Sequence, residues 1–180
     1  QFGLDPNRRT PSGIKAAIIR EKGTNGEREM AYMLYLAGFD VKDVTMTDLI
    51  SGRETLEDIN MVVYCGGFSN SDVLGSAKGW AGSFLFNPKA KAALDNFYAR
   101  EDTLSLGVCN GCQLMMELGL ITPEDKKKGK MLHNDSHKFE SNFLGVTVPM
   151  NRSVMFGSLS GSKLGIWVAH GEGKFSLPYP

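Results

Sequence analysis

One cysteine in this sequence is framed by residues that would suit a catalytic thiol. Cys109 lies in the segment LSLGVCNGCQLMM, residues 104–116, where an apolar run ends and a helical pattern starts. A strand, a tight Gly-Val-Cys-Asn-Gly turn and a helix form the thiol counterpart of the G-x-S-x-G nucleophile elbow, which lifts a nucleophile above a sheet. We expect Gly107 and Gly111 to be required, because side chains there would collide with the neighbouring strand or helix. The pattern predicts nucleophilic catalysis by Cys109.

A thiolate that attacks a carbonyl group needs hydrogen-bond donors for the oxyanion that forms. The helix that follows Cys109 has its positive end at the turn, where it stabilises a thiolate, and the backbone amide of Asn110 is directed toward the oxyanion. A second donor is predicted at Gly67, in the Gly-rich turn after the preceding strand. Ligands of parallel sheets bind outside the carboxyl ends of the strands, where both turns lie. Cys109, Asn110 and Gly67 are therefore the predicted catalytic groups.

Other roles for these residue types stay open at this level. Cys109 could be a small buried hydrophobe in a non-catalytic flavodoxin-like binding module. Cys109 and Cys112 could form a C-x-x-C dithiol redox pair at a helix start, although such motifs usually follow an early strand. His133, Asp135 and His137 in HNDSH have a spacing that metal ligands use, but zinc needs three or four ligands and the segment resembles a loop.

Strands alternate with helices over the first two thirds of the chain. Strands are predicted over residues 14–19, 41–46, 61–65 and 104–108, and helices over 27–37, 88–100 and from Cys109 to Gly119, with a weaker helical pattern over 75–86. This alternation predicts an α/β fold, a flavodoxin-like parallel sheet with helices on both faces. The last third is different: strands are predicted over residues 139–148 and 166–169, with few helical residues between them.

Two polar segments have simpler interpretations. The turn GTNGE, residues 23–27, precedes a helix and could cradle an anion, but it matches no phosphate-loop pattern and is typical of an ordinary strand-to-helix turn. The lysine run at residues 126–128 is expected to be the solvated face of a loop. Neither segment predicts a ligand.

The composition argues against several classes of protein. The 20 Lys+Arg residues balance 20 Asp+Glu residues, so there is no basic excess for nucleic acid or an anionic membrane surface. The apolar runs are far shorter than the ~20 residues of a membrane span. Three cysteines argue against a disulfide framework and for a reducing cytoplasm. The chain starts with Gln1, and we expect a polar linker over residues 1–13, one domain over 14–180, and a longer parent protein.

Six segments, in consistent order from about Ile14 to Gly173, resemble one known family. The segments are REKGTNGEREM, MTDLISGR, YCGGFSNSDVLGSAKGWA, LGVCNGCQLM, HNDSHKFESNF and AHGEG. They are similar to the class I glutamine amidotransferase (glutaminase) domain of phosphoribosylformylglycinamidine synthases, the formylglycinamide ribonucleotide amidotransferases of purine synthesis. GVCNGCQ and GGFS-x-x-D are the most specific motifs. The linker and the GTNGE turn resemble the C-terminal domain of the large single-chain form more than the small separate subunit.

The resemblance implies a two-step acyl transfer with glutamine as the substrate. Cys109 would attack the side-chain carboxamide, ammonia would leave, and water would hydrolyse the glutamyl thioester to glutamate. The ammonia would feed a synthetase region of the same polypeptide, a ligase that uses ATP and Mg²⁺ to convert formylglycinamide ribonucleotide to its amidine in de novo purine biosynthesis. No cofactor or metal is expected in this chain.

The resemblance also assigns roles to individual residues. The amides of Gly67 and Asn110 would form the oxyanion hole. The residues that would bind glutamine are Phe68, Gln113 and, at its amino-acid end, His170, Gly171 and Glu172.

One departure from the family pattern bears on activity. The family's base and orienting acid lie in a P-H-P-E segment downstream of the HGEG loop, and this sequence stops at Pro180 before such a segment. His170 and Glu172 have the His-x-Glu spacing of that pair, but the resemblance places His170 in the earlier loop. We therefore do not assign a Cys109–His170–Glu172 triad, and expect a truncated domain that is inactive by itself.

Overall fold

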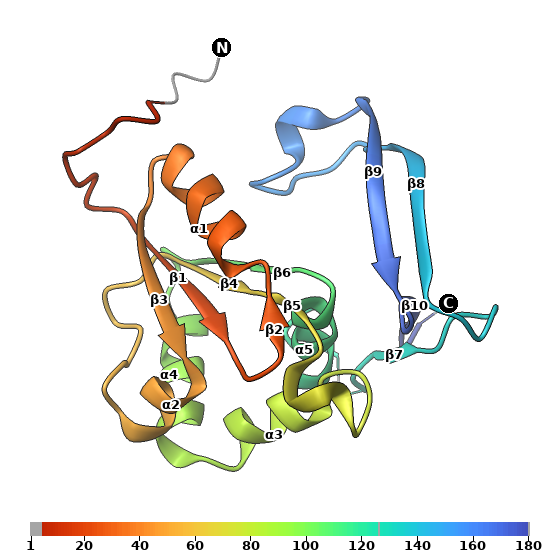
Figure 1. Cartoon of the computed structure of the whole chain (residues 1–180), viewed down its shortest axis with the longest axis horizontal. Helices are drawn as coiled ribbons and strands as arrows, with labels where there is room; N and C mark the ends of the chain where they lie inside the picture. The colour runs from red at the N-terminus through yellow and green to blue at the C-terminus, as the bar shows by residue number, and fades with distance from the viewer. Residues whose placement is uncertain (1–4, 126, 180) are drawn as a thin grey trace. The chain divides into compact units, whose positions relative to one another are not determined.

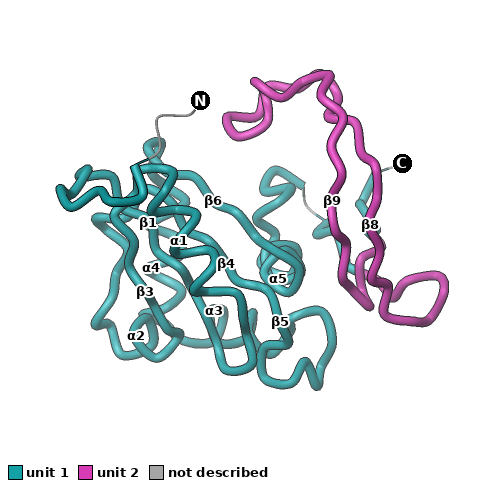
Figure 2. The backbone as a smooth tube through the Cα atoms, turned by 45° about the horizontal axis from the view of Figure 1, so that its top comes forward, with its two compact units in different colours: residues 1–131, 175–180 teal, residues 132–174 magenta. Residues whose placement is uncertain are grey.

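The structure is a computed structural model that describes residues 5–125 and 127–179. It divides into two compact units, residues 1–131 with 175–180 and residues 132–174, which Figure 2 draws in different colours. The first four residues of the predicted linker, residue 126 of the lysine run and residue 180 lie outside the described part.

A four-stranded parallel sheet lies at the centre of the first unit, in the order β3-β1-β4-β6 (Figure 1). The strands are β1 (Lys15–Arg20), β3 (Asp40–Thr45), β4 (Met61–Tyr64) and β6 (Leu104–Gly107). The side chains of β4 are all buried and those of β1 are buried except at its ends, as in a parallel sheet covered on both faces. The predicted α/β class is confirmed.

Helices cover the sheet on both faces, as predicted. The helix α1 (Glu27–Leu36) packs on one face through Leu34, against Ala16 and Ile18 of β1. The other face is covered by α2 (Met46–Ser51), α3 (Lys78–Leu85), α4 (Pro88–Tyr98) and α5 (Asn110–Leu118). Trp80 and Phe84 of α3 are fully buried in this larger core, and burial of each such side chain contributes about 1.5–3 kcal/mol.

The boundaries of most predicted elements in this unit hold to within two residues, but α2 was missed. The strand predicted over residues 41–46 ends at Thr45, because Met46 begins α2. The Asp48 carboxylate accepts hydrogen bonds from the backbone N–H of Thr45 at 2.9 Å and from its hydroxyl at 2.7 Å, which caps the new helix. The weak helix predicted over 75–86 starts only at Lys78, because Ala77 has a left-handed φ of 57°.

Two short strands join segments that are far apart in the sequence. The strand β2 (Thr24–Asn25) pairs antiparallel with β5 (Gly66–Gly67), so that Thr24 lies opposite Gly67. The 3-10 turn η1 (Ser69–Asp72) follows β5 after one residue, Phe68. The sequence did not predict this pairing, which anchors the Gly-rich turn after β4.

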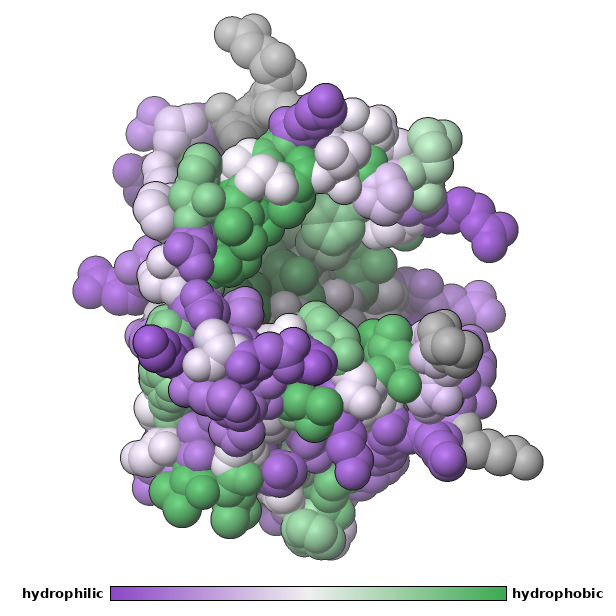
Figure 3. Space-filling view, turned by 90° about the vertical axis from the view of Figure 1, so that its right-hand side faces the viewer, coloured by the Kyte–Doolittle hydropathy of each residue, from purple (hydrophilic) through white to green (hydrophobic). Residues whose placement is uncertain are grey.

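The second unit is mainly an antiparallel ribbon of β8 (Glu140–Thr147) and β9 (Lys163–His170), with the 3-10 turn η2 (Gly157–Leu159) between them. The predicted strand over residues 166–169 is therefore too short by three residues at its start. Phe143 and Trp167 lie opposite each other with ring centroids 5.1 Å apart, and both are exposed. Figure 3 shows hydrophobic and hydrophilic residues interspersed on one face of the molecule.

The strands β7 (Lys130–Leu132) and β10 (Lys174–Ser176) pair at the boundaries of the second unit. Within the described residues, no helix is long and apolar enough to cross a membrane.

Candidate active site

Cys109 lies at the turn between a strand and a helix. The strand β6 ends at Gly107, α5 begins at Asn110, and Cys109 has φ 51° and ψ −108°. Residues other than glycine rarely adopt such a backbone conformation, because it costs about 1–3 kcal/mol. The residues that do adopt it cluster at functional sites. The cysteine is in no disulfide and is exposed, so the strained turn presents this residue to solvent. This is the elbow geometry that the sequence predicted.

The glycines on either side of the elbow are sterically required. A Cβ atom at Gly107 would lie 2.6 Å from the carbonyl oxygen of Gly111, and a Cβ atom at Gly111 would overlap the carbonyl oxygen of Tyr64. The close approach brings the start of α5 against the ends of β4 and β6, whose residues Tyr64 and Gly107 are paired. The predicted collisions are confirmed, with the backbone of the neighbouring strand and helix as the obstacle.

The Gly-rich turn after β4 lies beside Cys109. A Cβ atom at Gly66 would come within 3.3 Å of the Cβ atom of Cys109. Gly67 has φ 112°, and a Cβ atom there would be 2.7 Å from the carbonyl oxygen of Gly23. Phe68 follows with half of its surface exposed and donates its backbone N–H to Gly23 at 2.9 Å. The two turns predicted to form an oxyanion hole are therefore adjacent, with Gly66 rather than Gly67 against the cysteine Cβ.

The first residue of α5 is buried although it is polar. Asn110 is 1 % exposed, and its side chain accepts the backbone N–H of Ser69 at 3.0 Å and donates to Oε1 of Gln113 at 2.9 Å. The backbone N–H at the first position of a helix has no acceptor within the helix, so residue 110 has a donor suited to an oxyanion. The sequence singled out Asn110 for this amide and missed the role of its side chain.

The loop after the Gly-rich turn is strained. Asn70, Ser71 and Asp72 have φ values of 51°, 56° and 49°. Left-handed backbone costs roughly 1–2 kcal/mol at each residue that carries a side chain. Part of the compensation comes from the Asp72 carboxylate, which accepts the N–H of Ala77 at 3.0 Å, and from the N–H of Asn70, which donates to Lys22 at 2.7 Å.

The predicted glutamine-binding loop with His170, Gly171 and Glu172 lies in the second unit, whereas the other predicted site residues lie in the first. Asn134 organises this loop: its Oδ1 accepts the N–H of Gly173 at 3.1 Å and lies 3.0 Å from Nδ1 of His170. Its Nδ2 donates to the carbonyl oxygen of His170 at 2.8 Å. The sequence missed Asn134, which lies inside HNDSH between residues weighed as metal ligands.

Two side chains of HNDSH lie close to a side chain that could pair with them. His133 lies 3.5 Å from the Glu172 carboxylate, and Asp135 pairs with Lys174 at 2.6 Å. Among the described residues, no three His, Cys, Asp or Glu side chains gather in a way that could hold a metal ion.

The three cysteines form no disulfide and differ in their surroundings. Cys112 is half-buried on α5, and burial, with a smaller contribution from nearby Cys109, raises the pKa of its thiol. Cys65 is buried, and burial raises the pKa of its thiol to about 11. Both thiols are therefore poorer nucleophiles at neutral pH than an exposed cysteine would be.

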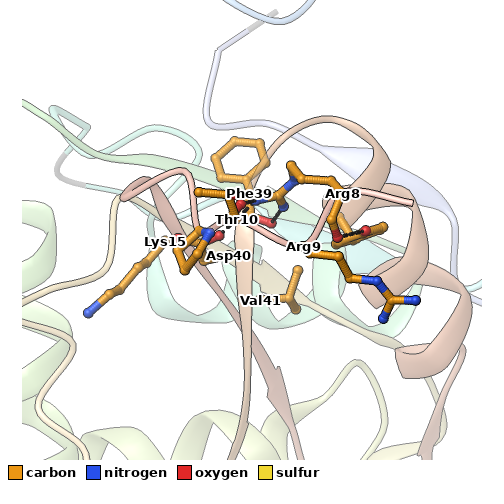
Figure 4. A pocket seen from close by; sticks show the side chains of 9 residues that line it. Arg8, Arg9, Thr10, Lys15, Phe39, Asp40 and Val41 are labelled. Atoms are coloured by element: carbon orange, nitrogen blue, oxygen red, sulfur yellow. Dashed lines mark hydrogen bonds and ion pairs between the residues drawn. The ribbon is translucent and has the colours of Figure 1, made fainter. Parts of the chain in front are cut away.

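A shallow pocket of about 450 Å³ lies at the amino ends of the parallel strands, where β1 and β3 begin. Arg8 reaches across it to Oδ1 of Asp40 and to the carbonyl oxygen of Phe39, at 3.0 and 2.6 Å, while the side chains of Arg9 and Lys15 point away (Figure 4). Because Cys109 follows the carboxyl end of β6, this pocket is not part of the candidate active site.

Residues 13–180 match the model of the CobB/CobQ-like glutamine amidotransferase domain. The chain belongs to this family. Because the family is one of glutamine amidotransferase domains, Cys109 in its elbow is a candidate nucleophile for that reaction.

Named relatives agree with this assignment. The chain is 47 % identical over 170 residues to a probable phosphoribosylformylglycinamidine synthase, chloroplastic/mitochondrial, of Arabidopsis thaliana, covering 91 % of the chain and 12 % of the relative. It is 44 % identical to the phosphoribosylformylglycinamidine synthase of Drosophila melanogaster, covering 94 % of the chain and 13 % of the relative. The chain thus spans about an eighth of the length of these curated relatives.

A solved structure shares the fold over most of the chain. The structure of PurLQS from Thermotoga maritima superposes with a TM-score of 0.74 at 26 % identity, covering 92 % of this chain and 70 % of that chain. The resemblance inferred from the sequence motifs is confirmed by the family model, the relatives and this structure.

Proposed function

We propose that this chain is the glutaminase part of a phosphoribosylformylglycinamidine synthase. The observation that carries the proposal is the strained, exposed Cys109 at the start of α5. It lies between Gly107 and Gly111, where any side chain larger than hydrogen would collide with backbone atoms. Together with membership of a glutamine amidotransferase family, this geometry supports nucleophilic attack on the carboxamide of glutamine.

The proposed reaction proceeds through a covalent intermediate. The Cys109 sulfur bonds to the carboxamide carbon, and the amides of Gly67 and Asn110 donate to the oxyanion of the tetrahedral adduct. The C–N bond then breaks, and the nitrogen takes up a proton and leaves as ammonia. Water attacks the thioester carbon, the C–S bond breaks, and glutamate and the free thiol result. Phe68, Gln113, His170, Gly171 and Glu172 contact the substrate.

The activity of the isolated chain depends on whether it contains a base for proton transfer. The 180 residues contain three histidines and no P-H-P-E segment. His170 is held by Asn134 in the HGEG loop and is proposed to bind substrate. Without a base to accept the thiol proton and return it to the leaving nitrogen, we expect the chain alone to bind glutamine weakly and to turn it over hardly at all.

The rest of the proposed enzyme is supported by the lengths of the relatives. Because the chain spans about an eighth of their length, we propose that a synthetase region of the same polypeptide binds ATP and Mg²⁺ and uses the ammonia to make the amidine of formylglycinamide ribonucleotide. No residue of this chain is assigned to ATP or Mg²⁺, and no nucleic acid or membrane partner is proposed. The proposed location is the cytoplasm.

The test is active-site labelling of the full-length parent polypeptide by a glutamine-mimicking chloroketone, with and without excess glutamine, followed by digestion and mass mapping. We expect an adduct on Cys109 that glutamine suppresses, and none on buried Cys65, which serves as an internal control. The adduct should be absent from Cys109→Ser. Labelling that is equal in the presence of glutamine would contradict the proposal, and steady-state glutaminase activity of the 180-residue chain would contradict its expected inactivity.

The dithiol alternative is not favoured, because the family assignment explains the elbow and burial raises the pKa of Cys112. Cys112→Ser separates the two functions, since it would abolish a redox cycle and leave the Cys109 adduct intact. Recovery of Cys109 and Cys112 as a disulfide, with no adduct, would favour the redox pair.

A further inference from the structure

The side chain of Asn110 connects two segments that the proposed reaction uses. Its Oδ1 accepts the backbone N–H of Ser69, 41 residues away in the sequence, and its Nδ2 donates to Gln113 one helical turn later. All three residues are at least 94 % buried. A buried amide with partners on both of its polar atoms is held in one orientation, because leaving either atom unsatisfied is costly.

The hydrogen bonds determine which atom faces which partner. A backbone N–H can only donate, so the atom of Asn110 that faces Ser69 is the oxygen. Nδ2 therefore faces Gln113, and the atom of Gln113 that receives it is Oε1. The orientation of the Gln113 amide follows from that of Asn110, so one side chain sets both the loop and a predicted substrate-binding group.

The loop around Ser69, which is hydrogen-bonded to Asn110, has a strained backbone that such a bond can stabilise. Ser69 comes directly before three residues in the left-handed region and two residues after Gly67. The N–H groups of Phe68 and Asn70 bind the turn between β1 and β2, through Gly23 and Lys22 at 2.9 and 2.7 Å. The bond from Ser69 to Asn110 instead connects the loop to α5, the helix that begins next to Cys109.

We propose that the Asn110 side chain is a positioning residue that fixes the Gly66–Phe68 turn against Cys109, so that the oxyanion donors are in place before glutamine binds. This inference rests on the proposed glutaminase function. It assigns to residue 110 a second role, distinct from that of its backbone amide, which every side-chain substitution retains. Loss of the side chain would displace the Gly67 amide without removing it.

The test compares two reagents on Cys109. A glutamine-mimicking chloroketone passes through a tetrahedral oxyanion, whereas iodoacetamide alkylates the thiol by direct displacement and forms none. In Asn110→Ala we expect the ratio of the chloroketone rate to the iodoacetamide rate at Cys109 to fall by about 10- to 100-fold, less than the 100- to 1,000-fold loss that follows removal of an oxyanion donor. Asn110→Asp, which keeps an acceptor facing Ser69, should recover several-fold of this loss.

Asn87→Ala is the matched control for destabilisation. Asn87 caps α4, its Oδ1 accepting the N–H groups of Lys89 and Ala90, and it is not part of the candidate site. This variant should leave the rate ratio unchanged. In the chain without substitutions, the backbone N–H of Ser69 should exchange slowly with solvent deuterium, a measurement that does not depend on whether Asn110→Ala folds.

The outcomes distinguish failure of the proposed role of Asn110 from failure of the glutaminase proposal. Glutamine-protected labelling of the unsubstituted parent polypeptide, with an equal rate ratio in Asn110→Ala, would overturn the role of Asn110 and leave the glutaminase proposal standing. Fast exchange of the Ser69 N–H would also overturn it. Failure of the unsubstituted parent polypeptide to react selectively with the chloroketone would reject the glutaminase proposal and the role of Asn110 with it.

Discussion

The carbonyl oxygen of Tyr64 occupies the space that a side chain at Gly111 would need. Because the obstacle is the backbone of a central strand, it can move only if β4 shifts within the sheet. We predict that Gly111→Ala costs about 1–3 kcal/mol in the free energy of unfolding, as overpacking does elsewhere. Urea unfolding of the chain measures it.

Gly82→Ala provides the control for this substitution. Gly82 lies in α3, and a Cβ atom there would contact only the Phe86 ring at an ordinary 3.6 Å. Alanine in a helix is favoured over glycine by up to about 1 kcal/mol, so this variant should be as stable as the original chain or more so. A Gly111→Ala variant of equal stability would contradict the packing described around the elbow.

The cap of α2 should make stability depend on pH. Hydrogen bonds from the Thr45 hydroxyl, then from its backbone N–H, lower the pKa of the Asp48 carboxyl from 3.8 to about 2. Because the folded-state pKa is below the unfolded value, the stabilisation is fully present above about pH 4 and is lost as the pH falls through about 2. Unfolding free energies of the chain and of Asp48→Asn should differ at pH 7 and converge toward pH 2.

Thr45→Ala tests the same cap from the other side and should cost about 1 kcal/mol at pH 7. Asp95→Asn is the comparison, because Asp95 makes an exposed ion pair with Lys91 on α4 that should contribute no more than about 0.5 kcal/mol. If Asp48→Asn is no more destabilising than Asp95→Asn, the cap does not stabilise α2.

The segment before β1 should be held to the sheet by one carboxylate. Asp40 accepts the N–H groups of Ser12 and Gly13 at 3.0 and 2.8 Å and pairs with Arg8, and the Ser12 hydrogen bond followed by that of Arg8 lowers the pKa of its carboxyl to about 2. At pH 7, Asp40→Ala should speed hydrogen exchange at the Ser12 and Gly13 amides. Asp43→Ala, which removes the exposed partner of Arg20, should leave both rates as they are.

His170 should have a fixed tautomer. Nδ2 of Asn134 donates to two carbonyl oxygens, those of His170 and Lys138, so the atom that faces Nδ1 of His170 is an oxygen. Nδ1 must then carry the proton, and Nε2 is the unprotonated nitrogen of the neutral ring. Nitrogen-15 chemical shifts of the imidazole should show this form in the chain and a mixture in Asn134→Ala, with exposed His137 as an internal reference. Protonation at Nε2 in the unsubstituted chain would contradict the assignment.

Local patterns in the sequence were sufficient for the four parallel strands of the first unit, for four of its five α-helices and for the turn that carries the candidate nucleophile. The apolar runs of β1 and β4 and the glycines at 107 and 111 each act over a few residues, so strand, turn and helix could be predicted around Cys109. Such signals depend on backbone conformation and on burial of a short segment, which neighbouring residues largely determine. The family motifs then supplied the chemistry that spacing alone left open.

Only the tertiary structure decided the contacts that organise the candidate site. The pairing of β2 with β5, the bond from Ser69 to Asn110, and the bonds from Asn134 to the HGEG loop join residues 36 to 43 positions apart. Nothing in the local sequence distinguishes an asparagine that bridges two segments from one that lies on a solvated loop, because the partner is a backbone group whose position depends on the folded chain. The sequence therefore singled out Cys109 as the candidate nucleophile, and the fold determined which polar groups surround it.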